Sequence, residues 1–336
     1  TTKVEYKPST YFYVQSFEKG SSFQWETALP IPVQVVSKVE KVDHISKTKL
    51  LTCYEYYHGY YDGEEREFRG FARVDQKDTE FFNQFANDHL HEEGASALNR
   101  DNAYFVPPVL TRTWYHTGAF IQPEISKKWC CDTEAITMPI HEQVKKEYYK
   151  GDGKAFELTP SKLEHQASSF DRQTLREGLR SLKGQLLRQE IYGLDGSDSS
   201  THPYQVLYYN YQVRLLQEKG ENQQAIYWAY PHENLTYHYE RRPENPRITH
   251  GITLKVDDYG NTTDLVNIAY PARIPAYPDK KKAVYLSEEQ LCKCKFYTPD
   301  NLLSKYFIES ISYEVLVFLT IDESCEGRCS KSTLFC

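Results

Sequence analysis

A hairpin signature near the start of the chain constrains its fold more than any other feature. The alternating segment 51–61 is followed by Asp62 and Gly63, and a second alternating segment occupies 64–75. An Asp-Gly pair between two aromatic, alternating segments is a strong signal for a tight turn, because such a turn needs positive φ. Glycine adopts that conformation without strain. We therefore predict an antiparallel hairpin that has Gly63 in the left-handed region.

The remainder of the chain repeats this kind of segment. The sequence contains 28 tyrosines and 16 phenylalanines, which are residue types that suit a pleated, half-buried surface. Short alternating segments separated by turn-rich gaps are typical of one large, continuous sheet. Besides an opening strand within residues 1–20, such segments occupy 33–42, 109–117, 202–216, 224–230, 235–241, 248–256 and 262–270.

One segment has a helical pattern. Four leucines follow the i, i+4, i+7, i+11 spacing of a single apolar stripe: Leu175, Leu179, Leu182 and Leu186. Glycines at 193 and 196 supply a stop signal. Since a sheet leaves an apolar face that must be covered, we predict one helix over 171–191 that packs on the sheet as a brace.

Charge and hydropathy argue against two classes of partner. The net charge is -7, whereas a protein that binds nucleic acid usually presents a basic face. The longest apolar run is 315–319, which is far shorter than the roughly 20 residues of a membrane-spanning helix.

The chain starts with Thr1, and its one methionine is Met138. We interpret it as a piece of a longer protein, so a missing signal peptide says nothing about export.

Two turns look like degenerate copies of one repeat. The segments 56–63 and 255–261 each place an acidic residue and a glycine at a turn beside tyrosines, and the second contains Asp258 and Gly260. This arrangement resembles the Tyr-Asp repeat, also called the YD or Rhs repeat, whose hairpins stack side by side into a winding sheet. Repeats of this kind bury their faces only against neighbours, so they build a wall and not a compact globule.

Longer motifs resemble the B-component (TcB) family of bacterial insecticidal toxin complexes, typified by TcdB, and its relative SpvB. The motifs follow the family's order over roughly residues 1–275, with no match after about Lys280. They are Leu29–Val36, Tyr56–Phe71, Thr111–Gly118, Leu182–Gly196, His202–Tyr204 and Leu235–Glu240. The resemblance implies a mainly β fold: a large winding antiparallel sheet of stacked hairpins with one bracing helix near 171–191.

The resemblance also implies a role. In that family the B component joins a C component to form a hollow shell around a toxic cargo, and a propeller in the B component docks on the A component. This chain would supply shell wall, secreted with the complex after a stage in the bacterial cytoplasm, and would have no catalytic residue, cofactor or metal. Asp62, Gly63, Asp258 and Gly260 would be structural turn residues. We divide the chain into shell segments 1–150 and 151–279 and a divergent, cysteine-containing tail, 280–336.

Two rival functions come from other classes. Glu65-Arg66-Glu67 matches the Glu-x-Glu of ADP-ribosyltransferases, an activity that SpvB has in a separate domain, but no Ser-Thr-Ser strand precedes it. The simpler interpretation is a set of charges on a sheet face. The second rival is a carbohydrate-binding or adhesion sheet, whose aromatic surface would be lined by Trp25, Trp114, Trp129 and Trp228.

Histidines and cysteines offer weaker metal candidates. The segments 89–93 and 141–142 contain His-Glu pairs, but neither supplies the second histidine of a His-Glu-x-x-His zinc site. Four thiolates suffice to bind zinc, yet the spacing of Cys292, Cys294, Cys325 and Cys329 is not that of a standard knuckle. We interpret these residues as polar surface and as part of the divergent tail.

Overall fold

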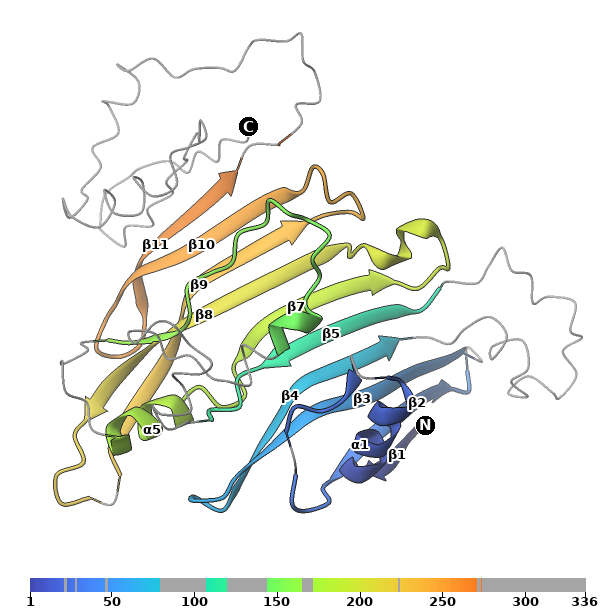
Figure 1. Ribbon diagram of the computed structural model, residues 1–336. Helices are drawn as coiled ribbons and strands as arrows, with labels where there is room; N and C mark the ends of the chain where they lie inside the picture. Colours follow the sequence, from blue (N-terminus) through green and yellow to red (C-terminus); the bar gives the residue numbers. More distant parts are fainter. Residues whose placement is uncertain are drawn as a thin grey trace, which may run out of the picture.

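The strands form one continuous, twisted sheet (Figure 1). The computed structural model describes residues 1–78, 107–119, 144–164, 172–270 and 273, apart from positions 21–22, 28, 46–47 and 223. Within these ranges the sheet has 11 strands in the order β1-β2-β3-β4-β5-β7-β8-β9-β10-β11, with β6 paired to β8 off this path. All described pairings are antiparallel except that of β6 with β8. The predicted mainly β, antiparallel fold is confirmed.

The described strands vary in length from two to 15 residues. The strands are β1 (Thr2–Pro8), β2 (Gln34–Asp43), β3 (Thr48–Asp62), β4 (Glu67–Asp78), β5 (Val109–Tyr115), β6 (Lys162–Leu163), β7 (Leu186–Gly193), β8 (Gln205–Gln217), β9 (Ile226–His238), β10 (Arg247–Val256) and β11 (Thr262–Tyr270). The helices are α1 (Ser9–Glu18) and α5 (Arg172–Arg180), with 3-10 turns η5 (Lys145–Glu147) and η6 (Asp198–Thr201).

The predicted hairpin is present, but its turn is longer than expected. Strands β3 and β4 pair as far as Asp62 with Glu67, so a four-residue loop, 63–66, connects them. The Asp62 carboxylate accepts hydrogen bonds from the backbone N–H groups of Glu64 and Glu65, both at 3.0 Å. The left-handed residue is Arg66, with φ of 53°. The prediction that Gly63 has positive φ is wrong, because this capped loop puts the left-handed residue at its end.

The turn between β10 and β11 is organised by Asp257. Its carboxylate accepts hydrogen bonds from the backbone N–H groups of Tyr259 at 2.9 Å and Asn261 at 2.7 Å. Gly260 has φ of 94°, a conformation that glycine adopts without steric cost. Asp258 lies exposed in the same loop. The acidic residue that shapes this turn is therefore the one before the predicted Asp258.

The expected opening strand stops early. It ends at Pro8, and helix α1 follows. The residues of α1 that face the sheet are Ser9, Phe12 and Ser16, a three- and four-residue spacing that belongs to a helix. Phe12 packs edge-on against Tyr56 of β3 at 5.4 Å. Within 9–18 the strand prediction is wrong, because neighbouring aromatic residues imitate alternation while the buried positions follow helical spacing.

The predicted long helix is also shorter than expected. Helix α5 ends at Arg180, Gly184 has φ of 79°, and Leu186 already belongs to β7. The prediction of one helix over 171–191 is therefore wrong in its second half, and α1 is a second helix. The bracing role is confirmed, since Leu179 and Leu182 join a buried cluster that includes Trp114 of β5 and Tyr211 and Val213 of β8.

Candidate functional site

Two rows of charged and aromatic residues run across one face of the sheet. The strand register aligns the first row as Tyr57, Arg73, Trp114, Arg188, Tyr208, Leu235 and His250. The second row lies on the same face, two residues away from the first along each strand. It consists of Glu55, Asp75, Arg112, Glu190, Val206, Tyr237 and Ile248. Side chains directly opposite on neighbouring strands lie close enough to interact, so neighbours within each row can contact one another.

Aromatic rings stack on the two arginines of the first row. The Arg73 guanidinium lies 4.3 Å from the centre of the Tyr57 ring and 5.8 Å from that of Trp114. Arg188 lies between Tyr208, at 4.1 Å, and Tyr148, at 4.4 Å. Both arginines are buried, and a desolvated cation on an aromatic face gains roughly 2 kcal/mol.

Carboxylates of the second row neutralise the same arginines. Arg73 donates two hydrogen bonds to Asp75, at 2.7 and 2.5 Å. Arg188 contacts Glu190 through two nitrogens, at 2.7 and 2.6 Å. An unpaired buried charge costs several kcal/mol, and a paired one with good geometry recovers much of that cost. The two rows therefore form a paired ionic lattice.

The segment 144–164, here called the strap, lies across this face (Figure 1). Its first anchor is Glu147, whose carboxylate contacts His58 of β3 at 3.0 Å, Arg73 of β4 at 3.1 Å and the Trp114 indole of β5 at 3.3 Å. Burial would raise the pKa of Glu147, but the hydrogen bond from His58 and the charge of Arg73 outweigh burial and lower that pKa to about 2. One strap carboxylate thus joins three strands.

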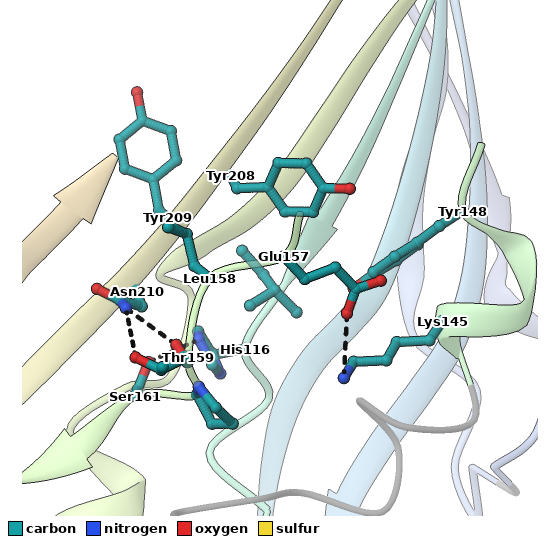
Figure 2. A pocket seen from close by; sticks show the side chains of 12 residues that line it. His116, Lys145, Tyr148, Glu157, Leu158, Thr159, Ser161, Tyr208, Tyr209 and Asn210 are labelled. Carbon is teal, nitrogen blue, oxygen red and sulfur yellow. Dashed lines mark hydrogen bonds and ion pairs between the residues drawn. The ribbon is translucent and has the colours of Figure 1, made fainter. Parts of the chain in front are cut away.

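The strap continues over the second half of the sheet. The Tyr149 backbone N–H donates to Glu190 of β7 at 2.9 Å, and the Phe156 N–H donates to the Tyr237 hydroxyl of β9 at 3.0 Å. Figure 2 shows the next contact, in which the Asn210 side chain of β8 donates to the Thr159 carbonyl at 2.9 Å. The strap then pairs with β8 as β6 and ends at Glu164, which contacts Arg214 at 2.5 Å.

A small cavity remains between the strap and β8 (Figure 2). Its lining includes His116, Tyr148, Ser161, Tyr208 and Asn210. Its volume is about 30 Å³, whereas pockets for small-molecule ligands have roughly 300–1,000 Å³. Burial lowers the pKa of His116 to about 4, so this imidazole is neutral near pH 7. The cavity is about large enough for one water molecule.

The sequence-predicted Glu-x-Glu lies where the β3–β4 loop meets α5. Glu65 contacts Arg176 of α5 at 3.3 Å. Glu67 contacts Arg180 at 3.3 Å and Lys183 at 2.8 Å, and the hydrogen bond from Lys183 is the largest cause of its lowered pKa. Both glutamates therefore neutralise cations that fasten the loop to the helix.

The turn residue Asp62 belongs to the same junction. Its carboxylate contacts Arg69 at 3.0 Å and Arg176 at 3.1 Å, in addition to capping the loop. Burial would raise its pKa, but the hydrogen bond from the Glu65 N–H and the two arginines lower it overall. Asp62 thus links the hairpin tip to α5. Gly63 lies in open space beside it.

The remaining sequence candidates do not form a site in the described ranges. Trp25 and Trp114 are buried at 8% and 0% exposure, so they cannot line a sugar-binding surface, and Trp228 packs on Tyr230 at 4.9 Å. Trp129, the segments 89–93 and 141–142, the four candidate zinc cysteines and the tail 280–336 lie outside the described residues. Among described residues, no three His, Cys, Asp or Glu side chains are grouped to hold a metal, and no helix is long and apolar enough to span a membrane.

Sequence reasoning missed both the ionic lattice and the strap. The lattice has a local signal, because Arg73 with Asp75 and Arg188 with Glu190 are opposite charges two residues apart in strands that also contain aromatic residues. On a strand this spacing places both charges on one face. Glu147 carries no comparable signal, since its partner His58 lies 89 positions away.

Two family models match this chain. The model described as the insecticide toxin TcdB middle/N-terminal region matches residues 1–118, and the one described as the insecticide toxin TcdB middle/C-terminal region matches residues 177–299. The second match continues past Lys280, where the sequence resemblance was expected to end. The search among curated proteins found no match.

Solved structures agree with the family models. The crystal structures of TcdB2-TccC3 and of TcdB2-TccC3 without its hypervariable C-terminal region, and the structure of a Photorhabdus luminescens Tc holotoxin pore with a TccC3 mutation, each match at 30% identity and a TM-score of 0.62. Each match covers 83% of this chain and 12% of the related chain, so this chain spans about one eighth of those relatives. By its two family matches and its sheet, the chain belongs to the TcdB-like B components of insecticidal Tc toxins.

Proposed function

We propose that this chain is a non-catalytic segment of shell wall in a toxin-complex B component. With a C component of the TccC type, the shell would enclose a toxic cargo before its delivery into host cells. The observation that carries the proposal is the match to TcdB2-TccC3 structures, at 30% identity over 83% of this chain.

The architecture supports a wall. In the described residues the sheet has two edge strands, β1 and β11, and its strands follow one another in chain order. Unpaired edges are a liability for an isolated protein, because they template pairing with other chains. In a longer protein they are the places where a wall continues. The strap covers the face that carries the ionic lattice, and a small cavity lies between it and β8.

The described charges support a non-catalytic role. A catalytic glutamate must face a substrate, whereas Glu65 and Glu67 both face cations at the α5 junction. Glu147 and Glu190 are likewise used in strap contacts. The ADP-ribosyltransferase alternative therefore has no support at its best sequence candidate.

The partners and the location follow from the proposed role. The C component would complete the shell, and the A component would be reached through a propeller elsewhere in the parent protein. The assembled complex would be secreted, after a stage in the bacterial cytoplasm. Neither nucleic acid nor a membrane span enters this scheme.

Protection of the cargo tests the proposal. The intact parent is co-expressed with a TccC-type C component, and the purified complex is treated with protease. We expect the C-terminal cargo to survive until the complex is denatured, because the wall excludes the protease. Cargo that is digested as fast as in the C component alone would contradict an enclosing role.

A further inference from the structure

The ladder between β7 and β8 is the shortest between neighbouring strands of the described sheet order. It pairs residues 188–191 with residues 205–208, four on each strand. The next ladder, between β8 and β9, extends along β8 from Gln205 to Gln217. Since each cross-strand pair adds to the stability of a sheet, the β7–β8 ladder is its weakest line. We call this line the seam.

The strap crosses the seam and is fastened on both sides. On one side Glu147 holds β3, β4 and β5 through His58, Arg73 and Trp114. On the other side Glu164 holds Arg214 of β8 and the Tyr230 hydroxyl of β9. The contacts of one segment therefore span the line where the direct strand pairing is shortest.

The strap also occupies the edge of β8 that β7 leaves unpaired. Beyond Tyr208 the β7 ladder ends, and β6 pairs in parallel with Gln212 and Val213. Between these two stretches, the Ser161 hydroxyl accepts a hydrogen bond from the Tyr211 N–H at 3.1 Å. Backbone groups of β8 that would otherwise lack a partner are satisfied by the strap.

The strap lies in the interval that neither family model matches, between residues 118 and 177. Its Glu147 anchor reaches strands of the first matched region, and its Glu164 anchor reaches strands of the second. The described part of this interval, 144–164, therefore connects strands of the two matched regions.

We propose that the strap is a latch that keeps the β7–β8 seam closed, so that the sheet opens along this line when either anchor is released. The biological meaning of the latch rests on the proposed function: in a shell, the seam would be the line along which the wall flexes or parts. The latch itself is a property of the chain and can be tested without a C component.

The test is hydrogen exchange resolved by peptide in the full chain. Glu147→Gln and Glu164→Gln weaken the two anchors on opposite sides of the seam. Glu157→Gln is the matched control, because Glu157 is in the same strap with a half-exposed side chain whose carboxylate lies 3.5 Å from Lys145. A hydrogen bond to a charged group contributes enough that its loss raises the exchange of a local opening by about tenfold or more.

We expect both anchor variants to accelerate exchange in peptides that cover 188–191 and 204–208, while the control matches the wild type. The seam amides would respond although neither substituted residue lies in β7 or β8. The latch is refuted if each variant accelerates exchange only beside its own anchor, or if the control accelerates the seam equally. If Glu147→Gln fails to fold, the exchange of the Glu164→Gln variant decides whether the strap is a latch. The Glu164 side chain is 15% exposed and that of Glu147 3%, so the substitution of Glu164 disturbs a less buried site. A missing shell would count against the proposed function and not against this result.

Discussion

Replacing Leu182 with alanine tests how the region after α5 is fastened to the sheet. Leu182 is fully buried in the cluster with Trp114, Tyr211 and Val213. The substitution removes three carbon groups at about 0.8 kcal/mol each. The cavity that remains adds to this cost, and buried leucines typically lose 2–5 kcal/mol. We expect a loss of about 3–4 kcal/mol in the free energy of unfolding.

The matched control is Leu216→Ala, because Leu216 at the end of β8 is 53% exposed. A surface substitution of this kind changes stability by no more than about 0.5 kcal/mol. Both variants are compared with the wild type by urea unfolding of the full chain, monitored by circular dichroism. The slope of the free energy of unfolding against urea concentration should be the same for all three proteins. Equal unfolding midpoints for the two variants would refute the placement of Leu182 in the core.

Three further predictions concern charge, backbone and chemistry. Glu147→Gln should lower the free energy of unfolding near pH 7. Because the pKa of Glu147 falls from 4.5 to about 2 on folding, the stabilisation by its carboxylate is complete above pH 4.5 and disappears as the pH falls through 2. The free energies of unfolding of variant and wild type, measured as a function of pH, should therefore approach each other only in that interval. Gly260→Val should lower the free energy of unfolding by about 1–3 kcal/mol, because the φ of Gly260 is 94° and a Cβ there would lie 3.2 Å from Trp228. Gly63 lies in open space, so Gly63→Val should have the melting temperature of the wild type. Glu67→Gln should leave the toxicity of an assembled complex unchanged, and NAD consumption by this chain that the substitution abolishes would contradict a non-catalytic wall.

Local patterns predicted the strands well where neighbours in sequence are also neighbours in the sheet. The β3–β4 and β10–β11 hairpins are of this kind, because turn residues and alternation are local signals. The same patterns were ambiguous at Leu186, which continues a helical leucine stripe and also starts an alternating segment. Pairing of Leu186 with Tyr115 of β5 decides in favour of strand, and that pairing is not visible in the local sequence.

The charge spacing of the ionic lattice is visible in the local sequence, but its burial is not. Arg73 and Arg188 have the composition of a solvent-exposed strand face, and arginine is seldom buried unless it is paired. They are buried because the strap covers them and because rings from other strands stack on them. The positions of the strap and of those rings are set by tertiary contacts, so the local sequence around Arg73 and Arg188 does not show that these arginines are buried.

Electron cryomicroscopy of the intact parent with a TccC-type C component shows whether this chain forms part of a shell wall. We expect a hollow particle whose wall contains this sheet, with neighbouring strands paired to the edges of β1 and β11. A particle without an internal space, or one in which this sheet lies outside the wall with both edges unpaired, would contradict the proposed function.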